Sequence, residues 1–174
     1  MPHGYVIGLA APDQIAQLPA VERRAAARFD DALAVRMVES VLPLEVLAEA
    51  QHSDRLWVAA LPDKRAVGFA LVELAGTRVH LAELDVLPEY GRQGVGAGLL
   101  RTVEAWASSA GYEAITLTTY RDVPWNAPFY AKLGFTELEH DMLDERLLSV
   151  LEHEAALGLE PPARIVMIKR LAAA

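Results

Sequence analysis

The segment 84–100, with the sequence LDVLPEYGRQGVGAGLL, constrains the fold more strongly than any other part of the chain. It places a glycine-rich turn between a strand-like run and an amphipathic helix. The first N–H groups of a helix have no partner within it, and they lie at the positive end of the helix dipole. Glycines let the backbone turn sharply and let an anion approach these amides. The turn therefore predicts a phosphate-binding site built around Gly91, Gly94, Gly96 and Gly98.

Two common phosphate-binding motifs do not fit this turn. A P-loop requires Gly-Lys-Ser/Thr, whereas Gly96 is followed by Ala97 and Gly98. The dinucleotide fingerprint G-x-G-x-x-G needs a different glycine spacing. Its ribose-binding acid is expected about 20 residues further on, where this chain has Thr118 and Thr119.

The segment instead resembles the acyl-CoA pyrophosphate loop of the GNAT superfamily of N-acyltransferases, in which Gln/Arg-x-x-Gly-x-Gly/Ala follows a strand that ends in valine. Val86 and the run Gly-Val-Gly at 94–96 match this pattern. The first position departs from it, because Gly91 stands there and the arginine comes one place later, at Arg92. The resemblance implies acetyl-CoA as acyl donor, bound by Leu84, Asp85, Val86, Arg92, Gln93, Gly94, Val95, Gly96, Ala97 and Gly98.

A second segment, 126–135 with the sequence NAPFYAKLGF, is similar to the Asn…Tyr-x-x-x-Gly-Phe motif of the same family. The resemblance implies that Tyr130 lies near the cofactor sulfur and protonates the departing thiolate, whose pKa is near 8.5. The alternative role for Tyr130 is packing of a short helix onto the sheet. Asn126 is expected to bind the pantetheine arm, to cap that helix, or to do both.

Periodicity and turn residues predict a mixed α/β chain. The order strand, helix, strand after residue 78 implies a crossover and a parallel pair. The resemblance implies a GNAT-like central sheet of about six to seven strands, with a splayed parallel pair and flanking helices. The expected strands are 3–9, 55–61, 66–74, 78–87, 114–119, 135–140 and 164–171, and the expected helices are 12–31 with a restart at Pro19, 43–51, 95–110, 129–133 and 143–157.

A general base is expected on the strand 78–87, because only about one lysine-like amine in 10³ is neutral at pH 7. Alternation places His80 on one face of this strand and Glu83 with Asp85 on the other. We favour Glu83 over His80 as the base, because burial just before the splayed segment would raise the pKa of a carboxyl group. A structural role for this glutamate is the alternative.

Composition limits the remaining possibilities. A chain of 174 residues with 53% hydrophobic residues predicts one domain, 1–174. Without a long apolar run or a signal sequence it is expected to be soluble and cytoplasmic, with no membrane partner and with a homodimer as one possible assembly. It has no cysteine, and its net charge of −8 argues against nucleic acid and is compatible with a cationic partner. No metal is expected, because His153-Glu154 lacks the second histidine of a zinc helix and is interpreted as a solvated helix face.

These features predict direct transfer of an acetyl group from acetyl-CoA to a primary amine. The alternatives are a non-catalytic acyl-CoA-binding module and an acyltransferase with another acyl donor or a hydroxyl acceptor. Carboxylates in the segment 30–42 and the helix 143–157 lead us to expect a small, cationic acceptor. They are Asp30, Asp31, Glu39 and Asp144.

Overall fold

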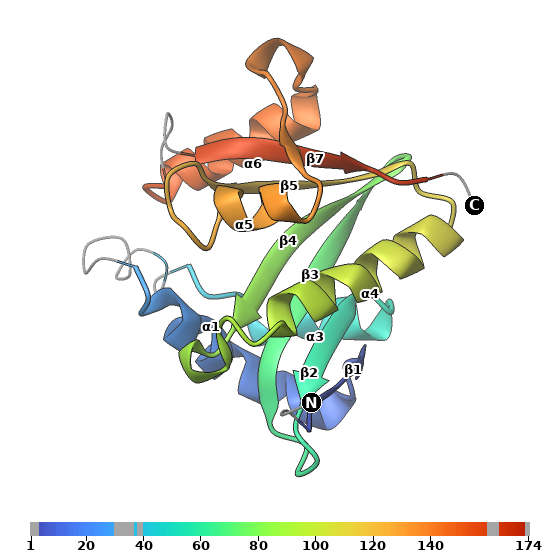
Figure 1. Cartoon of the computed structure of the whole chain (residues 1–174), viewed down its shortest axis with the longest axis vertical. Helices are drawn as coiled ribbons and strands as arrows, with labels where there is room; N and C mark the ends of the chain where they lie inside the picture. Colours follow the sequence, from blue (N-terminus) through green and yellow to red (C-terminus); the bar gives the residue numbers. More distant parts are fainter. Residues whose placement is uncertain (1–3, 30–36, 38–39, 160–163, 173–174) are drawn as a thin grey trace. The chain divides into compact units, whose positions relative to one another are not determined.

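The computed structural model describes residues 4–29, 37, 40–159 and 164–172 (Figure 1). Its seven-stranded mixed sheet has the order β1-β2-β3-β4-β5-β7-β6. This confirms the predicted α/β class, with one parallel pair and flanking helices. The strands are β1 (Val6–Leu9), β2 (Leu56–Ala60), β3 (Ala66–Ala75), β4 (Arg78–Val86), β5 (Ala114–Tyr120), β6 (Thr136–Glu137) and β7 (Arg164–Arg170).

The chain divides into two compact units, each made of two stretches. The first contains Met1–Glu73 and Ala82–Trp106, and the second contains Leu74–Leu81 and Ala107–Ala174. Strand β4 belongs to both, because its first half lies in the second unit and its second half in the first.

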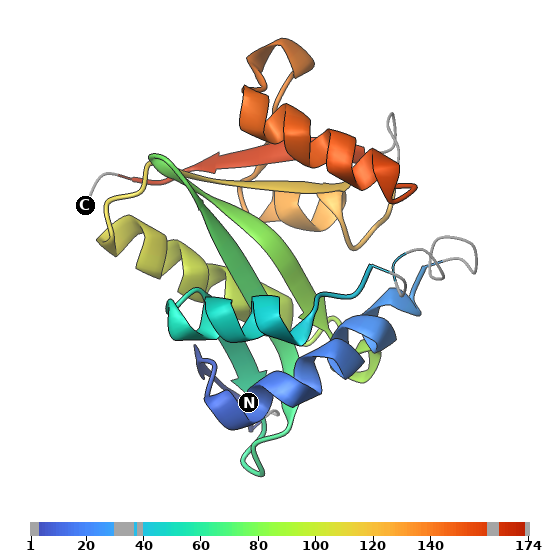
Figure 2. The ribbon, with the colours of Figure 1, turned by 180° about the vertical axis from the view of Figure 1, so that it is seen from behind.

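In the first unit, β1, β2 and β3 form an antiparallel meander. Helices α1 (Leu18–Ala26) and α3 (Leu44–His52) cover one face of these strands and α4 (Val95–Ser109) covers the other (Figure 2). The rings of Trp57 on β2 and Trp106 on α4 are in contact, with centroids 5.1 Å apart. The fully buried side chains of this core include Leu18, Leu47, Leu56, Phe69, Leu99 and Leu100.

The helix expected at 12–31 is divided in two. Pro12–Gln17 forms a 3-10 helix, η1, and α1 begins at Leu18 with Pro19 in its first turn. This confirms the restart at Pro19, because the first turn of a helix is where the missing N–H of proline costs nothing. Residues 30–36, 38 and 39, which include Asp30, Asp31 and Glu39 of the expected acceptor pocket, lie outside the described residues.

In the second unit, the first half of β4 pairs in parallel with β5, from Arg78↔Ala114 to Leu81↔Leu117. Strand β5 pairs with β7 along its whole length, and β6 pairs with β7 at the other edge. Helices α5 (Ala127–Lys132) and α6 (Glu145–Ala156) lie on opposite faces of β5 and β7 (Figures 1 and 2).

The strand expected at 135–140 is wrong in its extent. Strand β6 contains just Thr136 and Glu137; the amide of Leu138 makes one more bond to β7, and the chain then forms a 3-10 turn at His140–Met142. This stretch lies at the sheet edge, where mostly polar, exposed side chains provide little burial to extend the pairing. In the described part of the chain, no helix combines the length and apolarity needed to cross a membrane.

Candidate functional site

The glycine-rich turn joins β4 to α4 as the sequence predicts. After the 3-10 turn η2 (Pro88–Tyr90), Arg92 and Gly94 adopt positive φ angles of 58° and 86°. The amide of Gly98 donates to the carbonyl of Gly94 at 2.8 Å, a helical bond at the start of α4. The amides before Gly98 therefore lie in the first turn, where an α-helix provides no partner. A Cβ built on Gly94 meets no atom within 4 Å, so the space beside this backbone is open.

Two other glycines of the turn, Gly91 and Gly98, have packing roles. A Cβ on Gly98 would lie 2.8 Å from Cδ1 of Ile7, so this glycine lets α4 approach β1. A Cβ on Gly91 would lie 3.1 Å from the carbonyl oxygen of Pro88. The side chain of Gln93 donates to the carbonyl of Glu89 at 2.7 Å and so closes the turn.

An arginine that sequence reasoning missed, Arg28, lies beside the turn. Its guanidinium nitrogen would be 3.7 Å from a Cβ on Gly91. Burial, and after it the positive charge of Arg92, lower the pKa of Arg28. An ion pair of 2.7 Å between Arg24 and Glu89 connects the same helical region to η2. The turn therefore combines the amides of a helix start with two guanidinium groups, an arrangement suited to phosphate.

Three carboxyl groups meet in the first unit, and we call them the acidic cluster: Glu22, Glu83 and Asp85. One oxygen from each lies within 4.8 Å of the others. Glu83 and Asp85 share a face of β4, as alternation predicts, and Glu22 comes from α1. The carboxylate of Glu22 accepts from the amide of Leu42 at 3.1 Å and 3.3 Å. Gly68 of β3 lets the backbone of β4 approach closely here, because a Cβ at this position would lie 2.7 Å from the carbonyl oxygen of Asp85.

Two members of the acidic cluster, Asp85 and Glu22, have raised pKa values. Burial, and after it the charge of Glu22, raise the pKa of Asp85 to about 8, against a smaller effect of the hydrogen bond with Glu83. Burial raises the pKa of Glu22 to about 7, although the bond from Leu42 lowers it. The Oδ2 atom of Asp85 is buried and has no hydrogen-bond partner among the described residues.

Glu22 was not predicted as a site residue, although the sequence contains a signal for it. It lies in the buried stripe of α1 together with Leu18, Val21, Ala25 and Ala26. A glutamate at a core position of an amphipathic helix is unusual, because burying a charge is costly.

We expect Asp85→Asn to stabilise the protein at alkaline pH. Between the ordinary pKa of 3.8 and the folded-state value of about 8, the folded chain holds a proton that the unfolded chain has lost. The stability from this proton is complete below about pH 4 and is lost as the pH rises through about 8. Asparagine mimics the protonated form, so the variant should match the wild type at about pH 4 and exceed it at about pH 9 by at least about 2 kcal/mol, or roughly 4 °C in Tm.

Thermal unfolding of both proteins over this pH range provides the measurement. Asp63→Asn is the matched control, because Asp63 is exposed and hydrogen bonds from Arg65 lower its pKa. This control should show no gain at pH 9. Equal Tm values for wild type and Asp85→Asn at pH 9 would contradict the prediction.

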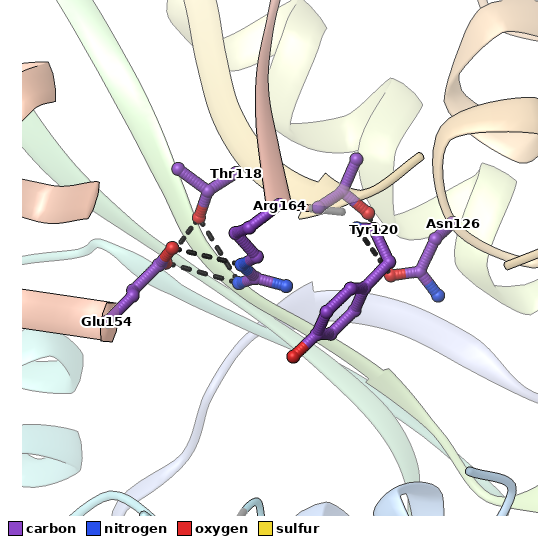
Figure 3. Close-up of polar contacts among 6 residues, drawn as sticks. Thr118, Tyr120, Asn126, Glu154 and Arg164 are labelled. Atoms are coloured by element: carbon purple, nitrogen blue, oxygen red, sulfur yellow. Dashed lines mark hydrogen bonds and ion pairs between the residues drawn. The ribbon is translucent and has the colours of Figure 1, made fainter. Parts of the chain in front are cut away.

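In the second unit, Asn126 joins the start of α5 to the end of β5. Its side-chain oxygen accepts from the hydroxyl of Thr119 at 2.8 Å and from the amide of Tyr120 at 3.4 Å (Figure 3). Asn126 occupies the N-cap position, but its side chain makes no capping bond. The expected capping role is therefore wrong, because the side-chain oxygen is used by β5.

Tyr130 lies on α5 and packs against two other aromatic side chains. Its ring meets Phe129 and Phe135 edge to face, with centroids 5.1 Å and 5.8 Å apart. Gly134 ends this segment with a φ of 90°, and the amide of Phe135 returns to the carbonyl of Tyr130 at 3.1 Å. The Tyr-x-x-x-Gly-Phe motif thus has a structural basis, because its three fixed residues form one compact turn.

His80, the alternative base, lies on β4, in register with Thr116 of the parallel strand β5. Its side chain is buried, with 4% of the residue exposed, and Nδ1 lies 3.0 Å from the hydroxyl oxygen of Thr116. Burial lowers the pKa of His80 to about 4, although the charge of Glu154 acts in the opposite direction. The imidazole is therefore neutral at pH 7 and a weaker base than a free histidine.

The interpretation of Glu154 as part of a solvated helix face is wrong. Its carboxylate makes two bonds to the guanidinium of Arg164, at 2.9 Å and 3.1 Å, and accepts from the hydroxyl of Thr118 (Figure 3). Both charged side chains are only about one seventh exposed, at 14% and 13%. The guanidinium also lies 4.9 Å from the ring centroid of Tyr120. This network anchors α6 to β5 and β7.

Asp144, expected near the acceptor, has a structural role. Its side chain caps α6 by accepting from the amide of Leu147 at 2.9 Å, and it forms an ion pair with Arg78.

Comparison with known proteins identifies the class. Residues 21–135 match the Acetyltransferase (GNAT) family, and the chain belongs to this family. The structure of this chain resembles that of PaiA N-acetyltransferase from Thermoplasma acidophilum in complex with coenzyme A, with a TM-score of 0.72, 18% identity, and coverage of 97% of this chain and 99% of that one.

Two further structures have the same fold. The ribosomal-protein-S18-alanine N-acetyltransferase from Escherichia coli matches with a TM-score of 0.67 and 18% identity over 98% of this chain and 96% of that one. N-acetylglutamate synthase from Neisseria gonorrhoeae, complexed with coenzyme A and N-acetyl-glutamate, matches with a TM-score of 0.73 and 16% identity over 99% of this chain. The match covers 36% of the synthase chain.

Proposed function

We propose that this chain, acting as one domain, transfers an acetyl group from acetyl-CoA directly to a primary amine of a small acceptor. The observation that carries the proposal is the start of α4, where Gly94 has a positive φ and open space beside it. Membership of the GNAT family and the coenzyme A in two similar structures support the same donor.

The proposed donor site uses backbone and arginine groups. The amides of the turn bind the pyrophosphate, and Arg92 and Arg28 add positive charge. The edge of β4 from Leu84 to Val86 binds the amides of the pantetheine arm, and one of its N–H groups polarises the thioester carbonyl. Asn126 is proposed as a further contact to the arm.

The proposed chemistry is direct displacement at the thioester. The amine nitrogen attacks the carbonyl carbon, a C–N bond forms, and the C–S bond breaks. Glu83 accepts the proton of the amine, and Tyr130 donates a proton to the thiolate, which leaves as free CoA. We favour Glu83 over His80 because the neutral, buried imidazole is a weak base.

The test is thiol release from acetyl-CoA with a panel of acceptors. The panel contains aliphatic amines, aminoglycosides, amino acids and peptides, each with a hydroxyl analogue, and mass spectrometry identifies the acetylated product. We expect acetyl transfer to at least one primary amine. Binding of CoA without transfer to any acceptor would favour a non-catalytic module. Transfer to a hydroxyl compound, or only from another acyl-CoA, would favour the other acyltransferase alternative.

The proposed setting of this reaction is the cytoplasm, with a homodimer as the proposed assembly and without a metal or nucleic acid.

A further inference from the structure

The acidic cluster contains a buried carboxyl oxygen that has no hydrogen-bond partner among the described residues. This oxygen is Oδ2 of Asp85. Leaving a buried polar atom unsatisfied destabilises the folded state, and more so when the group is charged. Buried oxygens in folded proteins nearly always have a partner. A ligand with hydrogen-bond donors would remove this cost.

The charge and spacing of the acidic cluster define the ligand. Three carboxyl groups close together favour a cation, and an ammonium group carries three donors. With charge-assisted N–H···O distances of about 2.8 Å, three oxygens around one ammonium nitrogen lie roughly 4.6 Å apart. The cluster oxygens lie within 4.8 Å of one another, so one ammonium nitrogen can contact all three when it replaces the hydrogen bond between Glu83 and Asp85.

We propose that Glu22, Glu83 and Asp85 form the recognition site for the ammonium group of the acceptor, so that this chain acts on a cationic aliphatic primary amine. The identification of this amine as the acceptor rests on the proposed function. Glu22 is the new element of the site, because it brings α1 into acceptor recognition while Glu83 and Asp85 come from β4.

Binding of an ammonium to this cluster should release protons. Glu22 and Asp85 titrate at about 7 and about 8, so both are largely protonated at pH 6. The charge of Glu22 and a hydrogen bond with Glu83 act on Asp85, and the charge of Arg23 acts on Glu22. An ammonium favours the ionised carboxylates. Its affinity should therefore rise between about pH 6 and about pH 9, below the pKa of the amine itself.

The experiment uses the full chain and n-butylamine as the probe. Titration followed by protein NMR at pH 6 and pH 8.5 gives the affinity, with butan-1-ol as the uncharged control of the same shape. We expect n-butylammonium to bind at least about tenfold more tightly at the higher pH, and butan-1-ol not to bind. Glu22→Gln should weaken n-butylammonium binding by at least about tenfold, the cost of one charge-assisted hydrogen bond.

Two controls accompany this experiment. One tests loss of a carboxylate outside the acidic cluster, and the other tests the CoA site. Glu45→Gln, at an exposed position of α3, should leave amine binding within about twofold of wild type. Calorimetry with CoA should give the same affinity for Glu22→Gln and wild type. If the wild type did not bind CoA, the proposed function would be contradicted. The amine titration would still test the acidic cluster directly.

Three outcomes would overturn the inference. The first is equal binding of n-butylammonium by wild type and Glu22→Gln. The second is binding that does not change between pH 6 and pH 8.5. The third is binding of Mg²⁺ or Mn²⁺ that Glu22→Gln abolishes and n-butylamine does not displace, which would make the cluster a metal site.

Discussion

Gly94→Val is expected to lower the affinity for CoA by at least about 100-fold. The valine side chain would occupy the open space beside the start of α4, where the pyrophosphate is proposed to bind. Losing two charge-assisted hydrogen bonds of about 1.5–3 kcal/mol each corresponds to this change in Kd. Calorimetry with CoA, on variants shown to be folded by circular dichroism, measures it.

Gly111→Val is the matched control for backbone strain. Gly94 and Gly111 have φ angles of 86° and 84°, and a Cβ on either meets no atom within 4 Å. Both substitutions should therefore cost similar stability, because valine is disfavoured at positive φ. Only Gly94→Val should lower the affinity for CoA. An equal decrease in CoA affinity in the two variants would contradict the prediction.

Replacement of Arg92 and Arg28 tests whether side-chain charge contributes to binding of the CoA pyrophosphate. Arg92→Ala and Arg28→Ala should each weaken CoA binding by no more than about tenfold, because a partly exposed charge contributes about 1 kcal/mol. If Arg92→Ala lowered the affinity for CoA as much as Gly94→Val does, the phosphate contact would be assigned to the arginine side chain.

Tyr130→Phe is expected to lower kcat by about 100-fold with little change in KM for acetyl-CoA. General-acid groups contribute about 10²- to 10⁴-fold, and the low end applies because the thiolate is a moderately good leaving group. Phenylalanine keeps the ring contacts with Phe129 and Phe135, so the turn of α5 should remain intact. Steady-state kinetics with the acceptor found in the screen provides the measurement.

Tyr112→Phe, at a half-buried position just after α4, is the control for loss of a tyrosine hydroxyl. Its kcat should stay within about twofold of wild type, because Tyr112 has no proposed part in the proton transfer. Unchanged turnover in Tyr130→Phe would assign this residue to packing. The pH profile separates the two roles further, because removal of a general acid should change the alkaline limb of kcat.

Local sequence signals were sufficient for most elements of the fold. The helix expected at 95–110 is observed as Val95–Ser109, and Gly111 follows it with a positive φ. The strand expected at 66–74 is observed as Ala66–Ala75. These elements were predictable because their boundaries depend on glycines, prolines and side-chain periodicity within a few residues.

The missed features depend on contacts between distant segments. Arg28 lies beside Gly91, and Glu22 meets Glu83, only after α1 has packed on the sheet. Glu154 appeared solvated because the sequence around it contains no partner. Arg164, which comes from β7, buries it. No periodicity identifies such a pair, because it depends on the tertiary arrangement rather than on spacing along one element.

The unsatisfied oxygen of Asp85 has a consequence for protein engineering. Asp85 destabilises the folded state at alkaline pH, and a neutral side chain of the same shape can replace it. Such a residue is a direct target of selection for heat resistance. Screening random variants for survival of heating at alkaline pH should therefore enrich substitutions at Asp85 and Glu22 early. If the cluster recognises the acceptor, thermostable variants at Glu22 would keep their affinity for CoA while losing their affinity for the acceptor. Selection for stability alone would then convert an acetyltransferase into a CoA-binding protein.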